Sequence, residues 1–259
     1  MLFPISLLYW LVIWIRNRLF DKQVLKSSKF NFPIICVGNL AVGGTGKTPM
    51  VELLLRLLHQ QFQTATISRG YKRKTKGFGI AGENTTALEI GDEPMQFHRK
   101  FPDVTVAVGE ERLEAIPQLL QEKPGTEVII LDDAFQHRTV TAGLNILLTE
   151  YSNLYTRDFA LPAGDLRDIR SSASRAEIIV VTKCPATMED ATKRQLLMEL
   201  GAGVKQKVYF TSFDYSLPTH LFQPNLQCKL QEGLSVLLVC GIANPKPLKE
   251  FLNQQVKTY

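Results

Sequence analysis

Short runs of Val, Ile and Leu alternate with amphipathic segments along the chain, and this alternation restricts the possible folds more than any other feature. Most of the runs are continuously apolar, which is typical of parallel strands covered on both faces. The pattern predicts an α/β fold, with a mostly parallel sheet and helices on both faces. The candidate strands are 33–38, 63–68, 104–108, 127–131, 145–149, 177–182, 207–212 and 235–240, and the candidate helices are 48–60, 110–122, 188–200 and 245–254.

The length of 259 residues fits one large domain or two small ones. A polar stretch rich in Pro and Gln, 216–233, is expected to be a linker. The predicted organisation is therefore an N-terminal helix with a basic connector at 1–30, a main domain at 31–215, the linker, and the start of a small second α/β domain at 234–259. A lone strand–helix unit of this size cannot bury its own faces, so this second domain is expected to be incomplete.

The positive charge is concentrated in the first third of the chain. Residues 1–80 hold 12 Lys and Arg against 2 Asp and Glu, whereas the whole chain has a net charge of +5. Such a region suits an anionic partner, such as phosphate, nucleic acid or an acidic membrane, but it also fits a solvated basic surface. The basic residues lack the interleaved aromatics of a nucleic-acid face, and no nucleic-acid partner or obligate protein partner is expected. The four cysteines are scattered, which predicts neither a zinc site nor a disulfide framework.

The segment Leu2–Ile15 is almost entirely apolar and is followed by Arg16, Arg18 and Lys22. It is short for a membrane span, which takes about 20 residues. No basic residue precedes it and no cleavage site follows, so it is a poor signal peptide. Its tryptophans suit the headgroup level of a bilayer. We expect a helix lying in the membrane interface, with a helix packed on the domain as the alternative.

The clearest chemical motif is the segment Ala41-Val42-Gly43-Gly44-Thr45-Gly46-Lys47-Thr48, between a predicted strand and a predicted helix. It has the pattern of a phosphate-binding loop, with Ala in place of the first Gly. Backbone N–H groups of such a loop surround phosphate oxygens, and the helix N-terminus adds partial positive charge. Lys47 is expected to reach the β- and γ-phosphates, and the Thr48 hydroxyl to bind Mg²⁺.

A second motif is the apolar strand that ends in Asp132 and Asp133. At the carboxyl edge of a parallel sheet, these carboxylates would lie beside the phosphate loop and help to hold Mg²⁺. Alone, two acids after a strand could equally form a turn or a helix cap. Together with the phosphate loop, they predict a site for ATP and Mg²⁺.

Seven segments in order resemble motifs of the tetraacyldisaccharide 4′-kinase family: Val37–Pro49, Ser68–Arg73, Gly91–Pro94, Leu131–Arg138, Leu161–Arg167, Val181–Lys183 and Gly241–Pro245. The resemblance covers nearly the whole chain. It implies a P-loop kinase domain at 31–215 that transfers phosphate from ATP, with Mg²⁺, to the 4′-hydroxyl of a tetraacyl glucosamine disaccharide 1-phosphate in lipid A biosynthesis. It also implies a peripheral location on the cytoplasmic face of a Gram-negative inner membrane.

The resemblance also implies roles for single residues. Asp92 matches the base that the family is thought to use, although Gly-Asp-Glu-Pro alone indicates a turn or a cap. Arg69, Lys72 and Arg73 form a cationic turn that could bind ATP phosphates or the substrate's 1-phosphate. Arg167 is expected to line the same cleft. The family has Arg-Glu-Pro where this chain has Arg167-Asp168-Ile169, which leaves the role of Asp168 open.

Two expectations concern the limits of the resemblance. The family pattern has a later Asp-His-His motif, whereas this chain stops at Tyr259, and we therefore expect impaired kinase activity. The alternative function is a membrane-associated P-loop protein that hydrolyses nucleotide as a switch or targeting ATPase. Lys183 lies where guanine-reading switch proteins carry their lysine, but Pro185 replaces the expected aspartate. The phosphate acceptor distinguishes the two functions, because a kinase transfers phosphate to an alcohol, whereas a switch hydrolyses the nucleotide.

Overall fold

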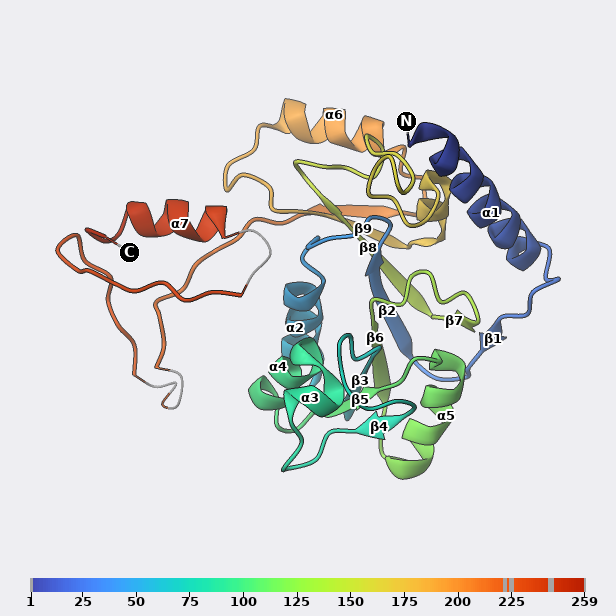
Figure 1. Cartoon of the computed structure of the whole chain (residues 1–259), viewed down its shortest axis with the longest axis horizontal. Helices are drawn as coiled ribbons and strands as arrows, with labels where there is room; N and C mark the ends of the chain where they lie inside the picture. The colour runs from blue at the N-terminus through green and yellow to red at the C-terminus, as the bar shows by residue number, and fades with distance from the viewer. Residues whose placement is uncertain (1, 221–222, 224–225, 242–244, 259) are drawn as a thin grey trace. The chain divides into compact units, whose positions relative to one another are not determined.

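The computed structural model describes residues 2–220, 223, 226–241 and 245–258 (Figure 1). The chain forms two compact units, Met1–Thr211 and Ser212–Tyr259, and each is described by itself. The first unit contains two sheets, six α-helices and a 3₁₀ helix among the described residues. Its strands are β1 (Ser28–Lys29), β2 (Ile34–Asn39), β3 (Thr64–Ser68), β4 (Gly79–Ile80), β5 (Thr105–Val108), β6 (Val128–Asp132), β7 (Val140–Thr141), β8 (Leu144–Glu150), β9 (Ile178–Thr182) and β10 (Lys207–Phe210).

The main sheet has eight strands in the order β10-β9-β8-β2-β6-β3-β5-β4. All neighbouring strands are parallel except β4, which pairs with β5 in the antiparallel direction. The seven strands predicted within residues 33–212 are confirmed, with ends shifted by at most two residues. The short pair β1 and β7 forms a separate parallel ribbon.

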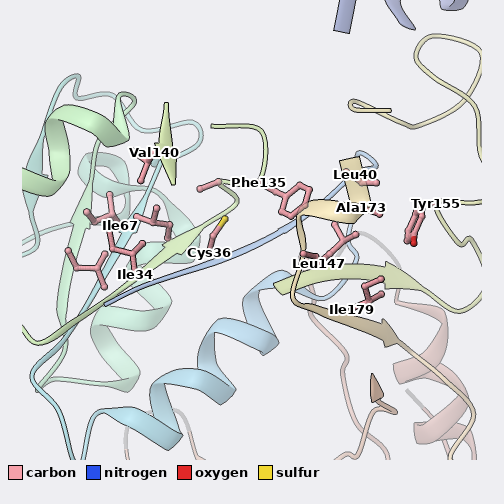
Figure 2. Close-up of a cluster of buried hydrophobic side chains, with 14 of the residues drawn as sticks. Ile34, Cys36, Leu40, Ile67, Phe135, Val140, Leu147, Tyr155, Ala173 and Ile179 are labelled. Atoms are coloured by element: carbon pink, nitrogen blue, oxygen red, sulfur yellow. The ribbon is translucent and has the colours of Figure 1, made fainter. Parts of the chain in front are cut away.

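Helices cover both faces of this sheet, as the apolar strands predicted. Alternate residues of β2 point to opposite faces, so Cys36 joins one buried cluster and Val37 joins the other. The first cluster packs on α5 and α6 and contains Phe135 (Figure 2). The second packs on α2 and α4. The helical segments between residues 47 and 200 are α2 (Lys47–Leu58), α3 (Ala87–Ile90), α4 (Asp92–Lys100), α5 (Arg112–Glu122), the 3₁₀ helix η1 (Arg170–Arg175) and α6 (Asp190–Leu200).

The N-terminal helix α1 (Phe3–Asp21) extends beyond the predicted apolar segment and buries its polar side. Ser6 and Asn17 are buried, together with Phe20 near the end of the helix, whereas Leu7, Leu8 and Leu11 are exposed. The usual arrangement of a surface helix is therefore inverted. Among the described residues, no helix combines the length and the apolar character that crossing a bilayer requires.

The second unit contains the helix α7 (Lys246–Asn253), which agrees with the predicted helix at 245–254. Tyr215 stacks on Phe251 of this helix, with ring centroids 4.7 Å apart. The predicted strand at 235–240 is wrong, since only an isolated bridge between Ser235 and Thr258 forms there. A strand needs a neighbouring strand to pair its amide and carbonyl groups, and the described part of this unit supplies none along 235–240.

The end of β2 packs against the loop after β6 so closely that only glycine fits. A Cβ at Gly38 would lie 2.6 Å from the Cβ of Phe135. We expect Gly38→Ala to lower the free energy of unfolding by about 1–3 kcal/mol, because the loop must shift. Gly125→Ala is the matched control, since no atom lies within 4 Å of its Cβ position. Chemical denaturation of both variants checks this, and equal stabilities would contradict the packing argument.

Candidate nucleotide and acceptor site

The candidate residues gather at the carboxyl edge of the main sheet. Because β3, β6, β2, β8 and β9 are parallel neighbours, their last residues meet at this edge. Val37 of β2 lies opposite Asp132 of β6, and Glu150 of β8 lies opposite Thr182 of β9. The segments that follow these strands therefore surround one region, although they are far apart in the sequence.

The phosphate loop, Ala41–Gly46, connects β2 to α2 as predicted. Gly46 immediately precedes α2 with φ +88°, a backbone conformation that side chains other than glycine rarely adopt. Lys47 begins the helix, and its Nζ lies 3.4 Å from Asn39 Oδ1 and 3.8 Å from Asp133 Oδ1. The Lys47 ammonium therefore lies between Asn39, at the end of β2, and Asp133, just after β6.

The helix α4 begins beside the phosphate loop. Thr48 Oγ1 donates to Glu93 Oε1 at 3.0 Å. Four residues further along α2, the buried Glu52 accepts hydrogen bonds from Gln96 and Lys100 of α4 at 2.5 and 2.8 Å. These contacts align the two helices in the same direction, so that both N-termini point to one region. Both helix dipoles then favour negative charge there.

Asp92 lies in the first turn of α4, so Gly91–Pro94 is the start of a helix rather than a simple turn. Its side chain is exposed and makes no hydrogen bond or ion pair with another described residue. Glu93, its neighbour, was missed by the sequence analysis. Its position next to Asp92 in a helix start was the available signal, but its contact with Thr48 is a tertiary feature.

Asp132 and Asp133 have opposite environments. Asp132 is buried and accepts a hydrogen bond from Ser68 Oγ at 3.2 Å, while its Oδ1 has no partner. Burial, reinforced by the charges of Glu93 and Asp133, raises the pKa of Asp132 to about 7. Burial also opposes ionisation of Asp133, but hydrogen bonds from Arg167 and the charge of Lys47 outweigh it and hold the pKa of Asp133 below its usual value.

Arg167, in the loop after β8, contacts residues at the carboxyl edge of the main sheet. Its guanidinium forms a two-pronged ion pair with Asp133, in which Nη1 lies 3.1 Å from Oδ2. The same group donates from Nη2 to Asn39 Oδ1 at 2.5 Å. Asn39 is fully buried, and its Nδ2 has no partner among the described residues. Sequence analysis predicted Arg167 and missed Asn39, for which no local pattern existed.

The three residues of the cationic turn are placed differently, and Lys72 is exposed beside the ring of Tyr71. Arg69 is exposed at the end of β3, and its charge is close enough to His137 and Arg112 to lower the pKa of both. Burial first, and then the charges of Arg112 and Arg69, lower the pKa of His137 to about 4. Arg73 is instead engaged by Glu110 at 2.6 Å and by the carbonyl of Gly77. We therefore expect Arg73 to shape its own loop rather than to contact phosphate.

Arg112 is a third residue that the sequence did not suggest. It is fully buried at the start of α5, and its Nη2 donates to the carbonyl of Asp132 at 3.4 Å. Its Nη1 donates to the carbonyls of Gly109 and Glu110, whereas its Nε has no partner among the described residues. Burial lowers the pKa of Arg112, whereas the nearby Asp132 and Asp133 raise it. A permanent cation thus lies directly behind the two aspartates.

Comparisons with known proteins agree with the motif order. The tetraacyldisaccharide-1-P 4′-kinase family matches residues 1–258. The chain belongs to the tetraacyldisaccharide 4′-kinase family. It is 49% identical to the tetraacyldisaccharide 4′-kinase of Flavobacterium johnsoniae, over 98% of this chain and 75% of that protein. The corresponding kinase of Phocaeicola vulgatus is 46% identical, over 97% and 70%.

A solved structure of this kinase family is also similar. The crystal structure of the "apo" form of LpxK from Aquifex aeolicus in complex with ATP superposes with a TM-score of 0.65 and 34% identity. It covers 82% of this chain and 80% of that one. These findings confirm the P-loop α/β fold and the enzyme class expected from the motifs, a tetraacyldisaccharide 4′-kinase of lipid A biosynthesis. They decide against the nucleotide-hydrolysing switch. The Gly241–Pro245 motif falls partly outside the described residues.

The unusual pKa of Asp132 in this kinase predicts a stability that falls with pH. Below about pH 4 the carboxyl is neutral in both folded and unfolded chains. Between about pH 4 and 7 the unfolded chain ionises while the folded one keeps its proton, so stability is lost as pH rises towards the folded pKa of about 7. We expect Asp132→Asn to raise the free energy of unfolding at pH 8 by roughly 2–4 kcal/mol, and to change it little at pH 4.

Urea denaturation at both pH values, without nucleotide or divalent cation, checks this expectation. Asp133→Asn is the control, because that carboxylate is stabilised by Arg167 and Lys47. It should lose stability at pH 8 rather than gain it. A stabilisation of Asp132→Asn that is the same at pH 4 and pH 8 would show that ionisation is not the cause.

Proposed function

We propose that this site transfers the γ-phosphate of ATP to the 4′-hydroxyl of a tetraacyl disaccharide 1-phosphate. The observation that carries the proposal is the placement of Asp92. The contact of Glu93 with Thr48, together with the contacts of Glu52 with α4, holds this exposed carboxylate beside the start of the phosphate-loop helix. An acceptor hydroxyl next to Asp92 is therefore also next to the terminal phosphate of a nucleotide in the loop.

The nucleotide phosphates are held by cations and backbone amides from several segments. The N–H groups of Ala41–Gly46 and the N-terminus of α2 surround the β-phosphate. Lys47 bridges the β- and γ-phosphates, and Arg167 approaches the γ-phosphate from the side of Asp133. Arg69, which is exposed at the end of β3, is available to the nucleotide or to the 1-phosphate of the acceptor.

The oxygen groups at this edge suit Mg²⁺. No group of three or more His, Cys, Asp and Glu that could hold a metal exists among the described residues. Mg²⁺ needs no such cage, because it uses one or two carboxylates together with phosphate oxygens and waters. The unpartnered Oδ1 of Asp132 and the Thr48 hydroxyl fit this role, with Asp133 beside them. When bound, the ion neutralises phosphate charge.

The reaction needs one proton acceptor. Asp92 orients the 4′-hydroxyl and takes its proton as the oxygen forms a bond to the γ-phosphorus. The bond between that phosphorus and the β–γ bridging oxygen breaks, and ADP leaves with the electron pair. Lys47 and Arg167 stabilise the charge that develops on the transferred group and on the leaving oxygen. The parallel N-termini of α2 and α4 strengthen this stabilisation.

The lipid acceptor gives a reason for the inverted helix α1. Its exposed Leu and Trp side chains suit burial at the boundary between headgroups and acyl chains, and Arg18 and Lys22 are exposed near its end. Basic residues at that level attract anionic headgroups. We therefore place α1 on the cytoplasmic face of a Gram-negative inner membrane, where soluble ATP meets a membrane-borne substrate.

Phosphate transfer tests the proposed reaction. With labelled ATP, Mg²⁺ and a tetraacyl disaccharide 1-phosphate in detergent micelles, we expect Asp92→Asn to lower kcat about 100- to 10,000-fold. Its affinity for ATP should stay unchanged, because Asp92 acts on the acceptor. Lys47→Ala should abolish ATP binding and transfer together. A fully active Asp92→Asn variant would exclude Asp92 as the base.

Vesicle binding tests the membrane role of α1. Both tryptophans of the chain, Trp10 and Trp14, lie in α1, so intrinsic tryptophan fluorescence reports on this helix alone. We expect a blue shift with anionic vesicles. The double substitution Leu8→Gln and Leu11→Gln should weaken binding at least about tenfold, because two leucines that would insert into the bilayer are lost.

Leu57→Gln on α2 is the matched control for this measurement. Leu57 is 60% exposed, close to the 63% of Leu8, but it lies on another helix. It should leave vesicle affinity unchanged. Equal losses for the two sets of variants, or no blue shift for the unaltered chain, would contradict an interfacial α1.

A further inference from the structure

The buried side of α1 carries polar residues that bond to the active-site loops. Ser6, Tyr9, Arg16 and Asn17 recur at helical spacing and face the body of the first unit. Each of them contacts a residue more than 100 positions away in the sequence. Apolar side chains would be sufficient to dock the helix, so the polar contacts indicate an additional role.

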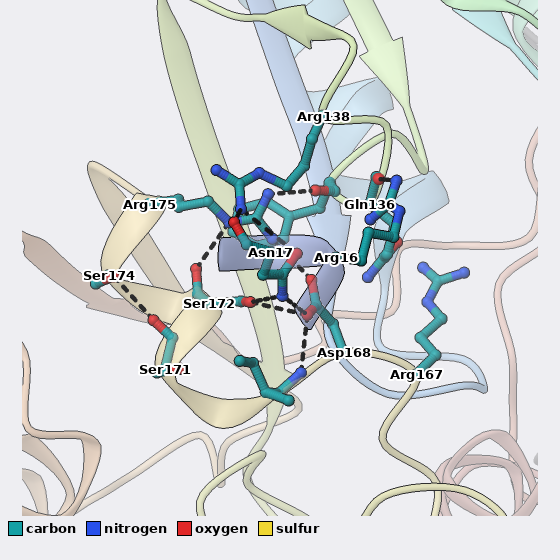
Figure 3. Close-up of polar contacts among 12 residues, drawn as sticks. Arg16, Asn17, Gln136, Arg138, Arg167, Asp168, Ser171, Ser172, Ser174 and Arg175 are labelled. Carbon is teal, nitrogen blue, oxygen red and sulfur yellow. Dashed lines mark hydrogen bonds and ion pairs between the residues drawn. The ribbon is translucent and has the colours of Figure 1, made fainter. Parts of the chain in front are cut away.

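The buried carboxylate of Asp168 receives the main contact. Asn17 Nδ2 donates to Asp168 Oδ1 at 2.8 Å and to Ser172 Oγ at 3.1 Å (Figure 3). Asp168 Oδ1 also accepts from Ser172 and from the amide of Ile169, both at 2.8 Å. Its other oxygen pairs with Arg175 at 2.7 Å. The chain directly after Arg167 is thereby fixed to α1.

The backbone of Arg167 is held from two sides. Its N–H donates to the carbonyl of Leu40, which immediately precedes the phosphate loop, at 2.8 Å. Its carbonyl accepts from Tyr9 Oη of α1 at 3.1 Å. The backbone of Arg167 is therefore held by hydrogen bonds to both the start of the phosphate loop and the N-terminal helix.

A second set of contacts leads from α1 to the guanidinium of Arg167. Arg16 of α1 donates to the carbonyl of Gln136 at 3.1 Å, and Gln136 Nε2 donates to the carbonyl of Asn39 at 2.7 Å. The side chain of Asn39 in turn accepts from Arg167. Two separate sets of contacts thus run from α1 to one residue at the nucleotide site, the first to the backbone of Arg167 and the second to its guanidinium.

We propose that Asn17, supported by Tyr9, is a positioning residue for Arg167, so that the seating of α1 sets how well the site holds the terminal phosphate of ATP. The proposal rests on the contact between Arg167 and the γ-phosphate put forward above. Asn17 touches no reacting group and acts through Asp168. The lipid-facing helix and the nucleotide site are then energetically coupled.

A double-mutant cycle separates this role from simple helix docking. We expect Asn17→Leu to raise the Kd for ATP, measured by calorimetry with Mg²⁺, roughly three- to tenfold, and Tyr9→Phe to raise it about twofold. In an Arg167→Ala background, the same two substitutions should have no further effect. The Kd for ADP, which lacks the γ-phosphate, should change less than twofold in every variant.

Phe3→Leu serves as the matched control on the same helix. The Phe3 ring meets the Phe159 ring edge-on, with ring centroids 6.3 Å apart, and neither ring belongs to the two sets of contacts that lead to Arg167. This substitution weakens a docking contact, and it should leave the Kd for ATP unchanged. Thermal unfolding of each variant verifies that the chain is folded under the assay conditions.

Two results would overturn the proposal in distinguishable ways. If Arg167→Ala weakens ATP binding but Asn17→Leu weakens it by the same factor in both backgrounds, the positioning role is wrong and the nucleotide role of Arg167 stands. If Arg167→Ala itself leaves ATP binding unchanged, the proposed phosphate contact fails, and the positioning role fails with it. Equal losses for ATP and ADP in Asn17→Leu would indicate a general structural effect.

Discussion

The ion pair between Arg167 and Asp133 connects three segments on which the rest of the site depends. Asp133 follows β6, Arg167 comes from the loop after β8, and both meet Asn39 at the end of β2. The two ion-pair partners are half-buried, whereas Asn39 is fully buried, so its side-chain oxygen would be costly to leave without a partner. The arrangement therefore fixes the mouth of the phosphate loop before any nucleotide enters, and Lys47 is held in the same group.

The second fixed relationship is the parallel alignment of α2 and α4. Glu52 is a buried carboxylate with Gln96, Lys100 and Arg56 around it, and its burial requires all of these donors. The contact acts a full helical turn away from the reacting groups, at the middle of α2. Rotation of α4 would break it, so the position of Asp92 depends on a contact that involves no site residue, in addition to the contact of Glu93 with Thr48. Preorganisation of this kind suits the role that we propose for Asp92.

The sequence was sufficient for those features that depend on local pattern. Continuous Val and Ile runs defined the strands of the main sheet, and the glycines before Lys47 defined the phosphate loop. The run at 235–240 has the same composition, but it has no neighbouring strand, and its prediction was therefore wrong. Propensity identifies a segment that is able to pair, whereas pairing itself depends on a partner elsewhere in the chain.

The side chains of the site were harder to predict for a related reason. Arg73 was predicted as a phosphate ligand from its basic turn, which remains a prediction, and its contact with Glu110, 37 positions later, could not be read from that turn. Asn39, Glu93 and Arg112 acquire their importance from contacts across the sheet edge, which no local pattern contains. The inverted side of α1 was likewise hidden, because Ser6 appears as a polar interruption of the apolar run and Asn17 as one of the polar residues after it, until the loops that bind them are known.

The distance along the chain between α1 and its partners has a consequence for biosynthesis. Asn17 is synthesised 151 positions before Asp168, and Tyr9 158 positions before Arg167. At about 5–20 residues per second, ribosomes take roughly 8–30 s to make that interval. The helix emerges long before the surface that buries its polar side exists, while its apolar side is complete from the start. For the interfacial helix that we propose, a bilayer close to the ribosome is therefore available to α1 earlier than the surface of its own protein.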